Sequence, residues 1–193
     1  MIPGTVEEIA LDGLCTRFIT GHFETSRAHL KLADAGRCEL AVLPQGTITH
    51  LAAAQAKGED SLLSDVGVGT FIDPRVGTGS QVAPGVGEML VTAEGDRLRY
   101  RLPKVTAAVV VATAADAEGN LYMDGAPMYG ETREASLAAK ANGGIALAVV
   151  ARIVPKDPDR IFLAAEHVDA VVLHPKADLA IGVPMNAPWP EYL

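Results

Sequence analysis

The sequence has 193 residues, of which 49% are hydrophobic, and its formal net charge is −8. This length fits one domain with a substantial core, and the negative charge argues against a nucleic-acid-binding protein, which would normally show a basic stripe. The start lacks a basic segment followed by an apolar run, and no apolar stretch reaches the length of a membrane span, so neither a signal peptide nor membrane association is expected. The two cysteines, Cys15 and Cys38, form no CxxC motif and predict no disulfide framework, so the expected location is the cytoplasm.

The first part of the chain predicts strands and helices in alternation. Residues 17–23 alternate weakly and predict a strand, and residues 39–43 predict a short buried strand ended by Pro44. A helix is expected from an N-cap at Ser26 to residue 35, and a second helix over residues 47–57.

A glycine-rich stretch follows over residues 67–80 and continues to Gly87. It is too long and too punctuated for an ordinary connection, and long loops of this kind are often functional. Residues 89–102 then predict a hairpin around a turn at residues 94–96.

The remaining chain again alternates between strands and a helix. A turn is expected at residues 115–120 and a helix at residues 131–141, and apolar strands are expected at residues 107–112, 145–150 and 168–173. This alternation indicates an α/β fold with an open, mostly parallel sheet flanked by helices. We expect a single domain over residues 1–181 and an extended tail or linker over residues 182–193.

Four segments carry a resemblance to a known family: Leu43–Leu51 with Pro-Gln-Gly-Thr, Val66–Arg75 with Gly-Val-Gly-Thr-Phe-Ile-Asp-Pro-Arg, Thr113–Leu121, and the run 134–153. They resemble segments of family I coenzyme A (CoA) transferases of the propionate/acetate and succinyl-CoA:3-oxoacid types. The segments keep the family's order and approximate spacing over residues 10 to 175. Each is weak alone, and in series they are fairly specific.

This resemblance implies the α/β fold of CoA-transferases and the transfer of CoA from an acyl-CoA to a carboxylate acceptor. In that family a glutamate of the second half attacks the thioester and forms a glutamyl-CoA intermediate, so no catalytic residue is expected in this chain. The strand and glycine-rich turn that begin the family's first half have no counterpart ahead of Arg17. The resemblance therefore implies part of a first half, active only with its second half, in an oligomer, with CoA as a substrate and no permanently bound cofactor.

Gln45 is the strongest candidate for a functional residue. It stands between a strand end and a helix start, where ligands gather in parallel α/β folds. On spacing alone, a cap for the helix is the simpler interpretation. The resemblance implies instead that its amide contacts the substrate carboxylate or the oxyanion. The N–H groups of Gly46 and Thr47 open the helix and are expected to be free to bind an anion.

The glycine-rich stretch supplies the second set of candidates, namely Gly67, Gly69, Thr70 and Phe71. Glycines let a ligand approach the backbone closely, so these residues could form a wall near the acyl group or pantetheine, and a purely structural turn fits them equally well. Asp73 and Arg75 are expected to fix the loop by a local ion pair. His22 is a possible pocket residue, and the histidines show no spacing of metal ligands, so no metal site is expected.

Two further functions fit the same residues. An acyl-CoA hydrolase would use water in place of the carboxylate acceptor, and a non-catalytic subunit would bind acyl-CoA and dock onto a partner. Generic dinucleotide binding has little support, because no GxGxxG follows the early strands.

Overall fold

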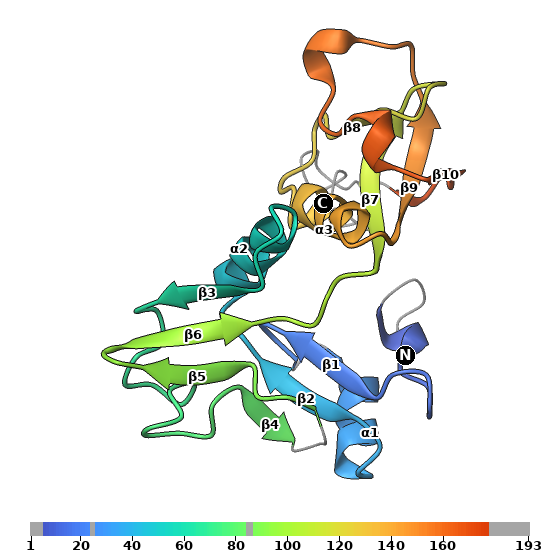
Figure 1. Cartoon of the computed structure of the whole chain (residues 1–193). Helices are drawn as coiled ribbons and strands as arrows, with labels where there is room; N and C mark the ends of the chain where they lie inside the picture. The colour runs from blue at the N-terminus through green and yellow to red at the C-terminus, as the bar shows by residue number, and fades with distance from the viewer. Residues whose placement is uncertain (1–5, 24–25, 84–86, 178–193) are drawn as a thin grey trace, which may run out of the picture. The chain divides into compact units, whose positions relative to one another are not determined.

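The computed structural model describes residues 6–23, 26–83 and 87–177 (Figure 1). It confirms the predicted α/β class, with mixed and antiparallel sheets accompanied by helices. The predicted tail over residues 182–193 lies outside the described residues.

The chain forms two compact units, each built from two separate stretches. Unit 1 comprises residues 1–51 and 60–103, and unit 2 comprises residues 52–59 and 104–193. One boundary falls inside helix α2 (Gln45–Gln55). The single domain expected over residues 1–181 stays a prediction.

Unit 1 contains two small sheets. The first is built, in spatial order, from β1 (Arg17–Thr20), β2 (Glu39–Val42) and β4 (Gln81–Ala83). Its β1–β2 pair is parallel and its β2–β4 pair is antiparallel. The second sheet is wholly antiparallel and contains β3 (Ser61–Ser64), β6 (Arg97–Arg101) and β5 (Val91–Glu94). The predicted hairpin is therefore confirmed as β5 and β6, and Gly95 adopts the positive φ that its turn requires.

The core of unit 1 lies between these sheets and the start of α2. Leu43, Leu51, Ile72, Leu98 and Tyr100 are buried in one apolar cluster. Because a strand side chain alternates between faces, the residues that flank Leu98 and Tyr100 on β6, all arginines, point away from this core. Burying these large side chains stabilises unit 1 by about 1.5–3 kcal/mol each.

A buried histidine stands at the start of α1 (Arg27–Asp34), which follows a turn of 3₁₀ helix at Val6–Ile9. The Ser26 hydroxyl does not cap α1 and instead lies 2.6 Å from His29 Nδ1. The His29 ring stacks on Phe18 with a centroid distance of 4.0 Å. Burial lowers the pKa of His29, although the nearby carboxylate of Glu7 partly offsets this.

Stability is therefore expected to fall as the pH drops below about 6.5, the usual histidine pKa. The unfolded chain takes up a proton at His29 there, whereas the folded chain resists it, so the contribution is present above this pH and lost below it. Unfolding midpoints measured between pH 7 and 5 should show this decline, and His29→Gln should reduce its slope. Equal slopes for wild type and His29→Gln would contradict the assignment.

Unit 2 is built on one sheet with the order β10 (Ala170–Leu173), β9 (Ile145–Ile153), β7 (Ala107–Ala115) and β8 (Leu121–Tyr122). The β10–β9 and β9–β7 pairs are parallel, and β8 pairs antiparallel with the end of β7. Helix α3 (Thr132–Ala141) packs across β7 and β9, and two 3₁₀ turns lie at Pro158–Arg160 and Ala165–His167.

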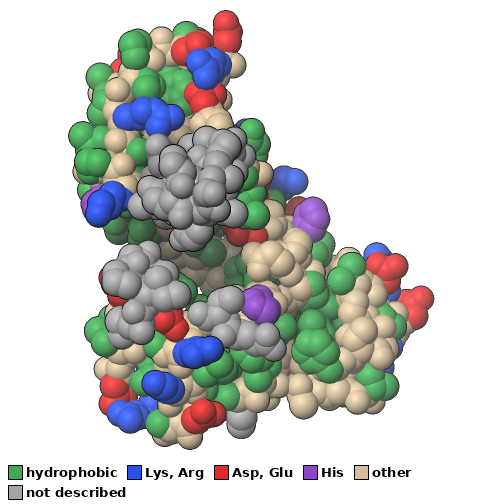
Figure 2. Space-filling view, turned by 180° about the vertical axis from the view of Figure 1, so that it is seen from behind, with side chains coloured by type: hydrophobic (Ala, Val, Ile, Leu, Met, Phe, Trp, Pro, Cys, Tyr) green, Lys and Arg blue, Asp and Glu red, His purple; other side chains and the backbone are tan. Residues whose placement is uncertain are grey.

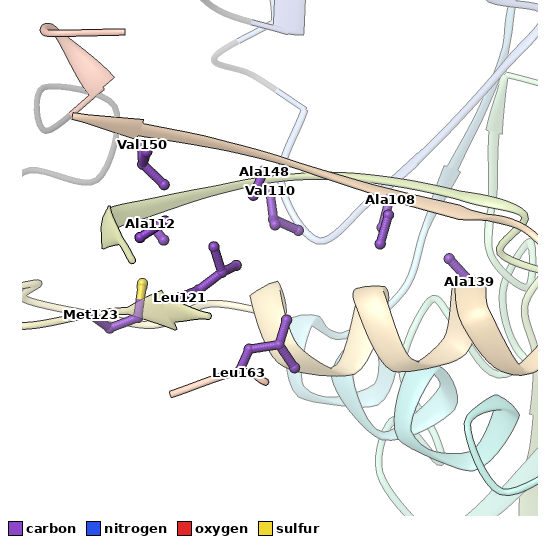
Figure 3. Packing of buried hydrophobic residues seen from close by; sticks show 11 residues of the cluster. Ala108, Val110, Ala112, Leu121, Met123, Ala139, Ala148, Val150 and Leu163 are labelled. Atoms are coloured by element: carbon purple, nitrogen blue, oxygen red, sulfur yellow. The ribbon is translucent and has the colours of Figure 1, made fainter. Parts of the chain in front are cut away.

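One face of this sheet forms the core of unit 2 (Figure 3). Ala108, Val110 and Ala112 of β7 and Ala148 and Val150 of β9 point to the same side. Leu121, Met123, Ala139 and Leu163 face them. Alternate residues of both strands are thus buried on this face, as a sheet with a helix on one side requires.

The end of α2 joins unit 2 through a buried glutamine. Gln55 Oε1 accepts hydrogen bonds of 2.9 Å from the Val105 N–H and from Asn142 Nδ2. Asn142 Nδ2 also donates to the Val105 carbonyl at 3.1 Å. Asn142 caps the C-terminus of α3, so this network fixes the end of α2 to the loops that precede β7 and follow α3.

None of the described helices combines the length and apolar character needed to cross a membrane. On the face shown in Figure 2, Lys and Arg side chains are interspersed with Asp and Glu.

Cys15 and Cys38 are both free, with their Sγ atoms 3.9 Å apart, and burial raises the pKa of Cys38 to about 11.

Candidate functional site

Gln45 is the first residue of α2 and stands where the parallel strands β1 and β2 end. It is exposed to solvent, and Leu43 N–H, just ahead of it, donates to the Thr20 carbonyl at 3.2 Å. The predicted position between a strand end and a helix start is therefore confirmed. In parallel α/β folds this is the edge at which ligands bind.

A glycine that sequence reasoning missed sets the position of Gln45. A Cβ atom on Gly21 would lie 2.4 Å from Gln45 Oε1 and 3.2 Å from Gln45 Cα. Real Cβ atoms essentially never approach a heavy atom within 3.0 Å, so any side chain larger than that of glycine at position 21 would force the Gln45 amide to move from its place against the end of β1. The only signal in the sequence was a glycine at a predicted strand end, which is common in turns.

The first turn of α2 corrects one expectation. The Thr47 N–H donates to the Pro44 carbonyl at 2.8 Å, and the Ile48 N–H does so at 3.2 Å, so the Thr47 N–H is not free to bind an anion. The Gly46 N–H has no partner among the described residues, and no atom lies within 4 Å of where its Cβ would stand. The Gly46 N–H is therefore open to a ligand, as was expected from its place at the start of the helix.

His22 lies in the turn that leaves β1, next to Gly21. The Thr20 hydroxyl donates to the His22 carbonyl at 3.1 Å and accepts from its N–H at 3.2 Å. These bonds fix the backbone while the side chain stays exposed. His22 is thus close in sequence to the Gly21–Gln45 contact, and its place in a pocket stays a prediction.

The glycine-rich stretch forms a series of turns between β3 and β4. Gly67 and Gly69 both adopt positive φ, at 84° and 74°. The Tyr100 hydroxyl donates to the Val66 carbonyl at 2.5 Å, and a Cβ atom on Gly67 would lie 2.7 Å from that hydroxyl. The two glycines therefore have a structural reason to be present.

Internal hydrogen bonds use two polar groups of the predicted wall. The Gly69 N–H donates to Asp73 Oδ2 at 2.9 Å, and the Thr70 hydroxyl donates to the Gly67 carbonyl at 2.7 Å. Phe71 remains 57% exposed and Val68 40% exposed, while Ile72 anchors the loop in the core. Of the predicted wall, the Phe71 side chain is presented to solvent, whereas the Gly69 N–H and the Thr70 hydroxyl are used inside the loop.

The predicted ion pair between Asp73 and Arg75 is confirmed. Arg75 Nε and Nη2 donate to the two carboxylate oxygens of Asp73 at 2.8 and 2.7 Å, and Nη1 donates to the Gly95 carbonyl at 2.8 Å. The Arg75 guanidinium, with help from the Gly69 N–H, holds the pKa of Asp73 well below its usual range. Asp73 is therefore ionised at neutral pH and holds Arg75, which ties the loop to the β5–β6 turn.

Two of the cavities formed by described residues lie in unit 2, and none of the predicted site residues lines them. The larger has a volume of about 540 Å³ and is lined by Arg152, Lys156 and Arg160 among others. Lys156 pairs with Glu118 at 2.6 Å and Arg160 with Asp124 at 2.8 Å, so both cations are already neutralised. Among the described residues, no group of three or more His, Cys, Asp and Glu side chains could hold a metal ion.

Comparison with known proteins gives a consistent result. A family model described as coenzyme A transferase matches residues 7–174. Acetate CoA-transferase YdiF of Escherichia coli K12 is 29% identical over 188 residues, which cover 94% of this chain and 35% of that protein. Caffeate CoA-transferase of Acetobacterium woodii is 30% identical over 145 residues, covering 74% of this chain and 28% of that protein.

Among solved structures, the acyl-CoA transferase YdiF of Escherichia coli O157:H7, in a thioester complex with CoA, matches with a TM-score of 0.81 and 28% identity. The match covers 89% of this chain and 35% of that chain. This chain thus spans about a third of the length of the relatives that it matches.

Proposed function

Since the chain belongs to the coenzyme A transferase family, we propose that it forms part of an enzyme that moves CoA from an acyl-CoA to a carboxylate acceptor. The nucleophilic glutamate is supplied by a second half, on a partner domain or chain. The isolated chain is inactive, and the active species is an oligomer that contains both halves. The span of about a third of the relatives' length is consistent with such a partial enzyme.

The observation that carries this proposal is the placement of the Gln45 amide. It stands exposed at the ends of two parallel strands, held against Gly21 and next to the open N–H of Gly46. A neutral donor suits a site that must accept both a carboxylate and a thioester. It stabilises the negative charge that develops on the carbonyl oxygen during acyl transfer without trapping a charged product.

The chemistry divides one difficult step into several easier ones. The partner's glutamate oxygen attacks the thioester carbonyl carbon and the C–S bond breaks. The CoA thiolate departs, and the product on the enzyme is an acyl-glutamyl anhydride. The thiolate then attacks the glutamyl carbonyl and releases the first carboxylate, which leaves a glutamyl-CoA thioester. The acceptor carboxylate reverses these two steps. Each attack passes through an oxyanion, to which the Gln45 amide and the Gly46 N–H donate.

The glycine-rich loop contributes apolar contacts. Phe71 and Val68 are exposed on a loop that Asp73 and Arg75 hold in one conformation. Such a wall can pack against the acyl chain or pantetheine, so that binding energy from these remote parts is used at the reacting carbon. Gly67, Gly69 and Thr70 form the backbone that presents this wall.

Trapping of the covalent intermediate tests the proposal. The complete native preparation is incubated with acyl-CoA, reduced with borohydride, and searched by mass spectrometry for a reduced glutamate. A reduced glutamate outside these 193 residues supports the transferase with a partner half; one within this chain means that the halves are assigned wrongly. Loss of the thioester without any acceptor indicates a hydrolase, and bound CoA with no trapped glutamate indicates a non-catalytic binding subunit.

A further inference from the structure

The two cysteines of the chain meet in unit 1, although 23 positions separate them in the sequence. Cys15 stands shortly before β1 and Cys38 directly before β2, and these strands pair in parallel (Figure 1). Their Sγ atoms lie 3.9 Å apart, which is direct contact between two sulfur atoms. A disulfide holds its sulfur atoms about 2.05 Å apart, so an approach of about 2 Å, within the reach of rotations about the Cα–Cβ bonds, joins them.

Backbone and side-chain contacts hold the two cysteine segments together. The Glu39 N–H donates to the Thr16 carbonyl at 2.9 Å, and this bond joins the residues that directly follow the two cysteines. Arg17 and Glu39 also form an ion pair at 2.9 Å. Ahead of the cysteines, Arg37 pairs with Asp12 at 2.6 Å. Unit 1 therefore sets the contact between the two sulfur atoms by itself.

Metal binding and simple packing do not account for this pair of thiols. In the part of the chain that the structure describes, no group of three or more His, Cys, Asp and Glu side chains could hold a metal ion, so the further ligands of a metal site are missing. Packing explains Cys38, which is 5% exposed, because a free cysteine behaves as a small apolar residue in a core. It gives no reason for a second sulfur atom in contact with the first.

We propose that Cys15 and Cys38 form a redox modification site, at which a low-molecular-weight disulfide such as oxidised glutathione converts the two thiols into an intramolecular disulfide. The new bond closes a loop that contains β1 and α1 and ties it to the start of β2. The inference is independent of the proposed function, because it rests on unit 1 alone.

The modification consists of two thiol–disulfide exchange steps. The Cys15 thiolate attacks one sulfur of the small disulfide, whose S–S bond breaks, so that one small thiolate leaves and Cys15 carries a mixed disulfide. The Cys38 thiolate then attacks Cys15 Sγ, and the second small thiolate leaves. The protein loses two electrons and two protons, and the small disulfide takes them up and becomes two thiols.

The burial of Cys38 determines the order of these steps. Burial raises the pKa of the Cys38 thiol, and the neighbouring Cys15 raises it further. Only the thiolate is a nucleophile, so Cys38 is the poorer first attacker. Once Cys15 carries a mixed disulfide, its charge and its thiol hydrogen bond no longer hold the proton on Cys38. Cys38 then acts as the resolving thiol.

Peptide mapping of the complete native preparation tests the site. The protein is reduced, freed of reductant, incubated with oxidised glutathione and digested under non-reducing conditions. The expected product is a pair of peptides joined through Cys15 and Cys38 of one chain, which dithiothreitol separates. Because a cross-link constrains the unfolded chain, the melting temperature of the oxidised protein should exceed that of the reduced protein by roughly 5–10 °C.

Serine variants test the order of the two steps. Cys38→Ser lacks the resolving thiol and should accumulate a glutathione adduct on Cys15. Cys15→Ser keeps only the buried thiol, so it should react about tenfold more slowly than Cys38→Ser, and its melting temperature should not change with the oxidant. If Cys38→Ser does not fold, timed alkylation of the reduced wild type gives the same order, with Cys15 labelled first.

Several results would overturn the proposal. A glutathione adduct that persists on Cys15 of the wild type would show that Cys38 does not resolve it. A covalent dimer on a non-reducing gel in place of the internal link would make the reaction intermolecular, and no reaction at either cysteine would remove the site. An internal link that leaves the melting temperature unchanged would overturn the stabilising effect of the bond.

Discussion

Replacement of Gln45 by alanine in the complete enzyme is expected to lower kcat by about 10²–10³-fold, the usual cost of losing one oxyanion donor. The fold should survive, because Gln45 is exposed and alanine is a better helix former in the first turn of α2. The measurement is steady-state CoA transfer, together with a melting curve of the same preparation.

Two comparisons make this result specific. His50→Ala changes another exposed side chain of α2 and should leave the rate unchanged. A loss in kcat with little change in KM for Gln45→Ala would place the contact in the transition state, whereas a rise in KM alone would place it in substrate binding. An unchanged rate would remove Gln45 from the mechanism.

Gly21→Ala should reduce turnover by about 10²-fold, the cost expected when a catalytic group is displaced by about 1 Å. The new methyl group would meet Gln45 Oε1, Cβ and Cα at 2.4 to 3.2 Å and would force the side chain away from the end of β1. Gly21 does not have a positive φ, so alanine fits the backbone there and the effect is steric.

The double variant Gly21→Ala/Gln45→Ala separates this mechanism from general damage. If Gly21 acts through Gln45, adding Gly21→Ala to Gln45→Ala should cost far less than Gly21→Ala alone, because the amide is already gone and only the milder contacts with Cβ at 3.0 Å and Cα at 3.2 Å remain. Two independent losses that multiply would show that Gly21 has another role.

The parts of the fold that the sequence predicted well are those with a strong local signal. The turn of the β5–β6 hairpin was expected from Glu94-Gly95-Asp96, and the end of α1 from Gly36, whose φ is indeed positive. The strands β3, β4 and β8 were missed, because none of them contains an apolar run as long as Leu40–Leu43, which revealed the equally short β2. Strands β7 and β9 extend beyond their apolar runs to Ala115 and Ile153, because pairing in the sheet continues after the pattern ends.

Part of the candidate site could also be predicted from local signals, and part could not. Pro44 and Gly46 mark the strand end and helix start that place Gln45, so its position could be read from neighbouring residues. The role of Gly21 could not, because it depends on a contact with a residue far along the chain. The prediction that the Thr47 N–H is free was wrong. This N–H donates to the Pro44 carbonyl because of the geometry of the turn.

The interleaved construction of the two units limits how this protein can be divided. The chain passes from one unit to the other after Leu51, Glu59 and Pro103, so no single truncation isolates either unit. A fragment that begins at Lys104 would lack Gln55 and leave the Val105 N–H and the Asn142 amide without their common acceptor. Gene fusion, duplication or recombination can therefore preserve the fold only by inheriting both units together.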